Sequence, residues 1–312
     1  MAGELVSGGL RYRTHVAYNS AQKYYLKFCQ LYQLQPIPAA EQQLLRFVAY
    51  AHLKGLQPST IKVYLSAVSS LHTLNGLQAP PTSAYRVKLA IKALADIGPA
   101  PSKCSPITYH LLGYIISTLR GYDLILYKAM LCLGFFGALR GAEYSASMAQ
   151  NGTLSALCQS HIQFVTTDGI QGLVLTLPKT KTTSKPIHVT IGCSGTDICA
   201  VCSMLQYLQL RHQLTGLHPA AYLFTHQDGR PVFRDRLNAV IKQAVTRLGL
   251  PAAGFSTHSL RAGAATTASQ VGFSDHEIKM LGHWASTAFT AYVHQTHSTT
   301  LLYAKRLTKE PL

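Results

Sequence analysis

Apolar residues recur at helical spacing along most of this chain, and short breaks containing Gly, Pro or Asn separate the repeats. The spacing predicts helices over residues 14–32, 39–53, 60–74 and 85–95, enough for a small four-helix bundle. The stretch 97–106 contains three Pro and one Gly, a composition typical of a linker. We therefore expect a helical domain over 1–96, a linker over 97–106 and a second domain over 107–312.

The second domain begins with two further helices, at 107–120 and 124–137, and then the period changes. Three short β-branched segments, at 161–165, 172–177 and 186–191, predict an antiparallel sheet with Asp168-Gly169 in its first turn. Helices are then expected at 197–214, 235–248, 258–271, 275–281 and 285–294, with a minor hairpin over 222–224 and 232–233. The fold class is mainly α with a small antiparallel β-sheet (α+β).

Charged residues are few in this chain, and most of them are basic. It has 28 Lys+Arg against 12 Asp+Glu, a net charge of +16, and residues 1–103 alone carry +8. Such an excess favours a polyanionic partner. The longest apolar run, 129–139, is too short to span a bilayer, and the N-terminus lacks the apolar segment of a secretory signal. DNA or RNA is therefore favoured over a membrane.

The seven cysteines are spread along the chain, unlike those of a small secreted disulfide scaffold, and this favours a reduced intracellular compartment. Cys199-x-x-Cys202, with Cys193 nearby, raises the alternative of a zinc site. Because the sequence offers no second cysteine pair and no suitably placed His, we expect buried free thiols here. We expect neither a metal nor a cofactor.

The residues best suited to chemistry lie between 258 and 292. His258 and Arg261 fall on one face of a helix, and Leu281-Gly282-His283-Trp284 closes a short one. Tyr292 follows His283 by nine residues, which on an unbroken helix would place the two on opposite faces. A break around 285–287 would let them converge. Upstream, Gly137-Ala138-Leu139-Arg140-Gly141-Ala142-Glu143 follows an apolar helix, and Lys181 lies in the second turn of the sheet.

In this order and spacing, these residues resemble the active site of the tyrosine recombinases, the phage-integrase family, over nearly the whole chain. The resemblance implies catalytic roles for Arg140, Lys181, His258, Arg261, His283 and Tyr292, with Glu143 and Trp284 in support. It also implies that residues 1–96 form the family's SAM-like core-binding domain and 107–312 its catalytic domain, with a C-terminal tail.

A finer resemblance is to the recombinases of DIRS-like and Ngaro-like retrotransposons and Crypton-type elements. It is carried by three stretches, namely residues 59–68, 132–137 and 257–266. That branch often has Gly-Arg-Trp where this chain has Gly282-His283-Trp284. Membership would imply a mobile-element enzyme that acts in the nucleus.

The implied reaction is DNA strand exchange through a 3′-phosphotyrosine, without ATP or a metal ion. Tyr292 would attack the phosphorus, the arginines would stabilise its oxygens, and Lys181 would protonate the leaving 5′-oxygen. His258 would accept the phenol proton or hold the phosphate, His283 would donate to a non-bridging oxygen, and Glu143 would orient His258 or Arg140.

Several assignments have alternatives. Lys179 or Lys185 could replace Lys181, or all three could only contact phosphate. Arg140 could stabilise a helix C-terminus, Tyr292 could be a core aromatic, and Tyr303 is a more distant candidate nucleophile. Trp284 is expected to pack against the helices of the site.

The resemblance also implies that duplex DNA is clamped between the two domains and that a C-terminal tail helix joins protomers. We expect a tetramer on two duplexes, with a monomer or dimer off DNA. The candidate phosphate contacts are Lys23, Lys27, Lys62, Arg86, Lys88, Lys92, Lys179 and Lys185. Two other functions remain open: a catalytically silent, domesticated DNA-binding protein, and a type IB topoisomerase-like enzyme.

Overall fold

The computed structural model describes residues 12–97, 104–148, 153–178, 185–215, 218–284 and 287–291. The chain divides into an N-terminal unit, Met1–Pro101, and a C-terminal unit, Ser102–Leu312. Each unit has its own hydrophobic core. In the part of the chain that is described, none of the helices combines the length and apolar character required to cross a membrane.

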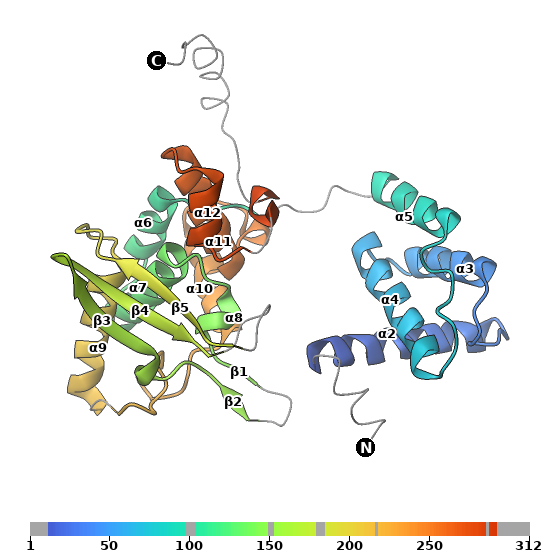
Figure 1. Ribbon diagram of the computed structural model, residues 1–312, viewed down its shortest axis with the longest axis horizontal. Coiled ribbons are helices and arrows are strands. Elements are labelled where there is room, and N and C mark those ends of the chain that lie inside the picture. Colours follow the sequence, from blue (N-terminus) through green and yellow to red (C-terminus); the bar gives the residue numbers. More distant parts are fainter. Residues whose placement is uncertain are drawn as a thin grey trace, which may run out of the picture. The chain divides into compact units, whose positions relative to one another are not determined.

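The N-terminal unit is a bundle of helices, as the apolar spacing predicts (Figure 1). Its described helices are α2 (Tyr12–Leu31), α3 (Glu41–Leu53), α4 (Pro58–Leu74) and α5 (Tyr85–Ile97). Helix α2 packs on α4, and α3 packs on α5. Buried Phe28, Leu44, Phe47 and Ile61 fill the centre. Because this packing uses one face of each helix, the other faces remain available to solvent or a partner.

The C-terminal unit packs helices against one side of a small sheet (Figure 1). Its described helices are α6 (Tyr109–Ser117), α7 (Gly121–Phe136), α8 (Gly141–Tyr144), α9 (Ala200–Thr215), α10 (Arg234–Arg247), α11 (Thr257–Gln270) and α12 (Asp275–Leu281). The short 3₁₀ segments are η1 (Gln159–His161), η2 (Ala252–Gly254) and η3 (Thr287–Ala291). The predicted class, mainly α with a small antiparallel sheet, is confirmed.

The sheet has the order β3-β4-β5 and is antiparallel throughout. Its strands are β3 (Ile162–Thr167), β4 (Ile170–Leu177) and β5 (Ile187–Gly192). Asp168 and Gly169 both have positive φ at the β3–β4 turn, the geometry expected of a tight hairpin. Leu173, Leu175 and Val189 point into the core, while alternate residues of β5 are exposed. The last pair of the β4–β5 ladder joins Leu177 to Ile187.

Some elements differ from the sequence predictions. Helix α8 and the hairpin of β1 (Ser147–Met148) and β2 (Leu154–Ser155) are too short to give a period. The expected hairpin over 222–233 is a turn with only an isolated bridge, between Thr225 and Pro231. Over its described part, the helix expected at 285–294 is the 3₁₀ segment η3, and residues 285–286, where a break is expected, lie outside the described residues.

Candidate active site

Arg140 begins the short helix α8 and is held there by Glu143. One carboxylate oxygen of Glu143 accepts a hydrogen bond from the Arg140 backbone N–H, and the other accepts one from its guanidinium, each at 2.8 Å. The Glu143 side chain is only 7% exposed, whereas that of Arg140 is 27% exposed. The ion pair therefore orients a guanidinium that still reaches the surface. Helix α7 ends at Phe136, so Arg140 caps the following helix and does not stabilise the end of α7.

Gly141 brings the start of α8 against the start of α11. A Cβ at Gly141 would overlap the Thr257 side chain, so a larger residue would push the two helix ends apart. The Thr257 backbone N–H donates to Asn238 Oδ1 of α10 at 2.8 Å. The contact between Gly141, which follows Arg140, and Thr257, which precedes His258, thus brings these two segments together.

His258 lies in the first turn of α11 and is half-buried. Its backbone N–H donates to Ser256 Oγ at 3.2 Å, and the Ser256 backbone N–H donates to Ser259 Oγ at 3.0 Å. This capping box fixes the N-terminus of the helix and hence the position of its first side chains.

Arg261 is almost wholly buried, at 2% exposure, and connects three segments. Its guanidinium donates to the Ala138 carbonyl before α8 and, at 2.7 Å, to the Gly282 carbonyl after α12. It also lies over the ring of Trp284, 4.1 Å from the centroid. Carbonyl and π-face partners compensate a buried cation that would otherwise be costly. Trp284 thus packs within the site, as the sequence analysis expects.

His283 is placed by the two residues beside it. Gly282 has φ −98°, so its conformation does not require glycine, but a Cβ there would overlap the ring of Trp284. His283 itself has φ +54°, in the left-handed region, which turns the chain at the end of α12. The indole can lie against Arg261 only because residue 282 lacks a side chain.

The surroundings of His283 lower its pKa below the ordinary histidine value. Partial burial of the ring has the largest effect, and the positive charge of Arg261 adds to it. Arg140 acts in the same direction, and the Glu143 carboxylate opposes them. The neutral imidazole is therefore favoured in the unliganded protein.

Arg140, Glu143, Arg261 and His283 meet at one small cleft, which we call the arginine cleft, whereas His258 and Trp284 are not among its lining residues. It is lined by Gly137, Leu139, Arg140, Glu143, Leu177, Ile187, Val189, Arg261, Gly282 and His283. Leu177 and Ile187 are the residues at which the β4–β5 turn leaves the sheet. The base of the turn that contains Lys181 therefore lies at the cleft.

The structure does not describe every predicted site residue. Lys179 and Lys181 fall outside the described residues, as do Tyr292, Tyr303 and the predicted tail helix. Lys185 is described and exposed. The last described residues of η3 precede Tyr292 directly, and η3 is anchored by buried Phe289, whose ring centroid lies 6.0 Å from that of Trp284. The roles of Lys181 and Tyr292 stay predictions.

The N-terminal candidates for phosphate contact all lie on exposed positions of the bundle. They are Lys23, Lys27, Lys62, Arg86, Lys88 and Lys92. Arg86 also forms an ion pair with Glu41 at 3.7 Å, although its side chain remains 64% exposed. Exposure is what a DNA contact needs, but a solvated surface shows it too, so these roles also stay predictions.

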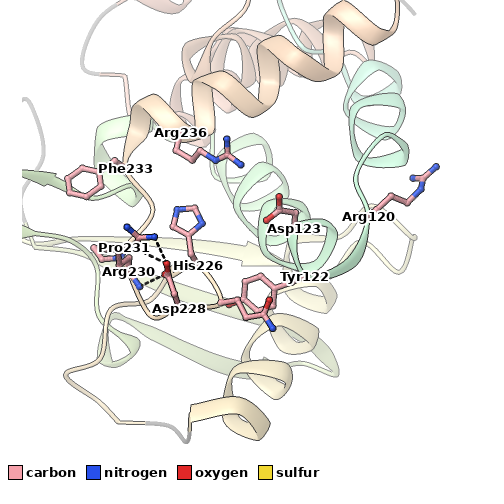
Figure 2. Close-up of a pocket in the computed structure, with 10 residues that line it drawn as sticks. Arg120, Tyr122, Asp123, His226, Asp228, Arg230, Pro231, Phe233 and Arg236 are labelled. Atoms are coloured by element: carbon pink, nitrogen blue, oxygen red, sulfur yellow. Dashed lines mark hydrogen bonds and ion pairs between the residues drawn. The ribbon is translucent and has the colours of Figure 1, made fainter.

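A second, wider hollow of about 750 Å³ lies in the C-terminal unit (Figure 2). It is lined by Arg120, Tyr122, Asp123, His226, Gln227, Asp228, Arg230, Pro231, Phe233 and Arg236. The lining thus includes three arginines and two aspartates, and Asp228 is paired with Arg230 at 2.6 Å. None of these residues is among the site residues expected from the sequence. Their only signal was a basic excess between 230 and 236, which does not reveal that Arg120 joins them.

Residues 154–299 match the phage integrase family. The matched stretch contains Lys181, His258, Arg261, His283 and Tyr292, and it begins after Arg140. No curated protein sequence matches the chain.

Solved structures share the fold at low sequence identity. The Tn1549 transposon integrase, in complex with transposon right end DNA, is 14% identical with a TM-score of 0.63, and the match covers 98% of this chain and 97% of that one. The XerH site-specific recombinase, bound to palindromic difH substrate, is 14% identical with a TM-score of 0.63, covering 92% and 76%. A lambda integrase dimer bound to a COC′ core site is 15% identical with a TM-score of 0.58, covering 94% and 92%. The fold is therefore that of the tyrosine recombinases.

Proposed function

We propose that this chain is a site-specific DNA recombinase that cuts and rejoins DNA strands through a 3′-phosphotyrosine intermediate. The observation that carries the proposal is the arginine cleft, where Arg140, Arg261 and His283 converge beside a single carboxylate. Cationic N–H donors in a partly buried cleft suit a phosphodiester whose oxygens gain negative charge during reaction. The phage integrase match supports the same reaction class.

In the proposed chemistry, the two arginines stabilise the non-bridging oxygens of the phosphate under attack. Donors of this kind contribute about 3–4 kcal/mol each to transition-state stabilisation in comparable sites. Glu143 keeps Arg140 oriented, and the carbonyls of Ala138 and Gly282 keep Arg261 oriented. His283 donates to a non-bridging oxygen, and His258 accepts the phenol proton or holds the phosphate.

The covalent step exchanges one phosphate ester for another. Tyr292 Oη forms a bond to phosphorus, the bond to the 5′-oxygen breaks, and that oxygen takes a proton from Lys181 to leave as a hydroxyl. Attack of a 5′-hydroxyl on the phosphotyrosine reverses the step and rejoins the strand. Because the ester is retained throughout, the reaction needs no ATP.

We propose double-stranded DNA as the partner and a tetramer on two duplexes as the assembly that exchanges strands. The net charge of +16 and the DNA complexes of the transposon integrase, XerH and lambda integrase support the first part. We further propose a mobile-element integrase of the DIRS, Ngaro or Crypton kind that acts in the nucleus, on the strength of the three sequence stretches that resemble that branch.

The decisive experiment traps the covalent intermediate. Suicide duplexes, nicked so that the cleaved strand is lost, would carry the sequences that flank the coding region in its source genome. We expect the wild-type protein to form a covalent adduct with such DNA, and Tyr292→Phe to bind it without forming one. Tyr303→Phe is the matched control and should still form the adduct.

Other outcomes distinguish the alternatives. An adduct formed by Tyr292→Phe would show that the nucleophile is assigned wrongly. Tight binding without an adduct on any suicide substrate would identify a silent DNA-binding protein. Relaxation of a supercoiled plasmid without recombinant products would identify a topoisomerase-like enzyme.

A further inference from the structure

Three cysteine side chains meet where β5 gives way to α9. Cys193 directly follows β5, Cys199 directly precedes α9, and Cys202 lies in its first turn. Cys193 Sγ lies 3.6 Å from Cys199 Sγ and 3.6 Å from Cys202 Sγ, and all three sulfurs lie within 4.8 Å of one another. The expectation of three buried thiols is wrong in part, because Cys193 is half-buried and Cys202 is exposed.

The spacing of these sulfurs suits a shared metal ion better than a disulfide. A tetrahedral zinc ion with bonds of about 2.3 Å to sulfur holds its thiolates about 3.8 Å apart. A disulfide brings one pair to about 2.05 Å and leaves the third thiol out. Here Cys193 is equally close to both neighbours, so the geometry selects no single pair.

Backbone groups around the cluster favour an ionised sulfur. The Ser194 backbone N–H donates to Cys199 Sγ at 3.4 Å. An N–H donor at this distance stabilises a thiolate at Cys199, and the thiolate is the form in which cysteine binds a metal ion.

We propose that Cys193, Cys199 and Cys202 bind one zinc ion as thiolates, with a fourth ligand from the solvent side at exposed Cys202. Thiolate ligands select soft or borderline cations such as zinc over magnesium or calcium. The Cys-x-x-Cys spacing at the start of a helix supplies two ligands from one turn, and the end of a strand supplies the third.

The role of this ion is structural. The loop between Cys193 and Cys199 already contacts α6, through a 3.2 Å hydrogen bond from Tyr109 Oη to Thr196 Oγ1 and the close fit of Ile198 on Gly113. The ion would therefore fasten β5 to α9 beside α6. Ile187 and Val189, near the opposite end of β5, line the arginine cleft. We expect the ion to stabilise the strand without taking part in DNA cleavage.

The test measures metal in the full-length protein, expressed with added zinc and purified under reducing conditions without chelators. We expect about one zinc per chain by mass spectrometry of the elements, lost in Cys199→Ser and kept in Cys158→Ser, a half-buried cysteine outside the cluster. Removal of zinc with a chelator should lower Tm by several degrees, and added zinc should restore it.

Wild-type protein alone provides a second readout if Cys199→Ser does not fold. Cobalt(II) added after zinc removal should give a sulfur-to-cobalt charge-transfer band, and zinc should protect three of the seven thiols from a thiol reagent. Folded wild-type protein that holds neither zinc nor cobalt at these thiols would overturn the proposal. A disulfide among the three, found by mass spectrometry of the native protein, would do the same.

Discussion

Gly282 shows how one missing side chain determines the geometry of the site. A Cβ at this position would overlap the Trp284 ring, and that ring carries the Arg261 guanidinium on its face. We expect Gly282→Ala to displace the indole, to lower the free energy of unfolding by about 1–3 kcal/mol, and to reduce covalent adduct formation. Chemical denaturation and the suicide-substrate assay measure the two effects.

Gly192→Ala is the matched control for this substitution. Nothing lies within 4 Å of a Cβ at Gly192, and its φ is not in the left-handed region. The control should therefore retain both stability and adduct formation. Equal behaviour of the two variants would show that the packing of Trp284 does not determine the position of Arg261.

The lowered pKa of His283 predicts a response to pH and to DNA. Because its pKa in the folded chain lies below that in the unfolded chain, protonation opposes folding, and the associated stability is lost as pH falls through the lowered pKa. A bound phosphate would favour the imidazolium, so we expect DNA to raise this pKa. Titration of histidine-labelled full-length protein by NMR, with His283→Gln for assignment, measures the shift. No change on DNA binding would contradict a phosphate contact.

At the residue scale, the sequence indicates which residues lie at the site better than it indicates what those residues contact. The structure brings Arg140, Arg261 and His283 together at the arginine cleft, and these residue types attract attention in the sequence because they occur in a known order and spacing. The partners of Arg261 could not be recognised in this way, because the Ala138 carbonyl is 123 residues away and the Gly282 carbonyl is 21 away. Backbone carbonyls also leave no signature in a sequence, since every residue has one.

At the element scale, the turn between β4 and β5 starts and ends at the arginine cleft. It begins after Leu177 and ends before Ile187, and both residues line the arginine cleft. Three lysines lie in this turn, Lys179, Lys181 and Lys185. A substrate whose leaving group needs no proton can identify the lysine that protonates the leaving oxygen in the proposed reaction.

We expect Lys181→Ala to slow strand cleavage by about 10²–10⁴-fold, the usual contribution of a general acid. A substrate with sulfur in place of the 5′-oxygen should restore cleavage, because a thiolate leaves without protonation. Lys179→Ala and Lys185→Ala should show neither the loss nor the rescue in cleavage-rate measurements. If the sulfur substrate restored cleavage by Lys179→Ala or Lys185→Ala and not by Lys181→Ala, the general acid would be the lysine replaced in the rescued variant.

The sequence predicts elements well where their apolar period repeats at least two or three times. Helix α4, predicted over 60–74, is Pro58–Leu74, and β5, predicted over 186–191, is Ile187–Gly192. Helix α8 is a single turn held by the two hydrogen bonds from Arg140 to the Glu143 carboxylate, so it has no period to detect. The apolar residues around η3 predict an α-helix, but they do not distinguish the α period from the 3₁₀ period that the structure has.

At the scale of the whole molecule, the net charge of +16 predicts binding that weakens steeply with salt. We expect Lys62→Gln and Lys88→Gln each to reduce the steepness of the fall of log K, the DNA-binding constant, with log salt concentration by about 1. Arg86→Gln should lower it less, because the guanidinium already lies 3.7 Å from Glu41. Fluorescence anisotropy with duplex DNA at several salt concentrations measures these slopes. Equal slopes for all variants and the wild type would show that α4 and α5 face away from DNA.

The burial of Arg261 also determines when the entropy cost of ordering its side chain arises. Ordering a long side chain costs up to about 2 kcal/mol of rotamer entropy, and here the two carbonyls and the indole impose that order during folding. DNA would thus encounter a preorganised guanidinium, whether its sequence binds well or poorly. If the protein acts as proposed, discrimination among DNA sequences arises at surfaces that contact bases, where substitutions could change the target without altering the arginine cleft.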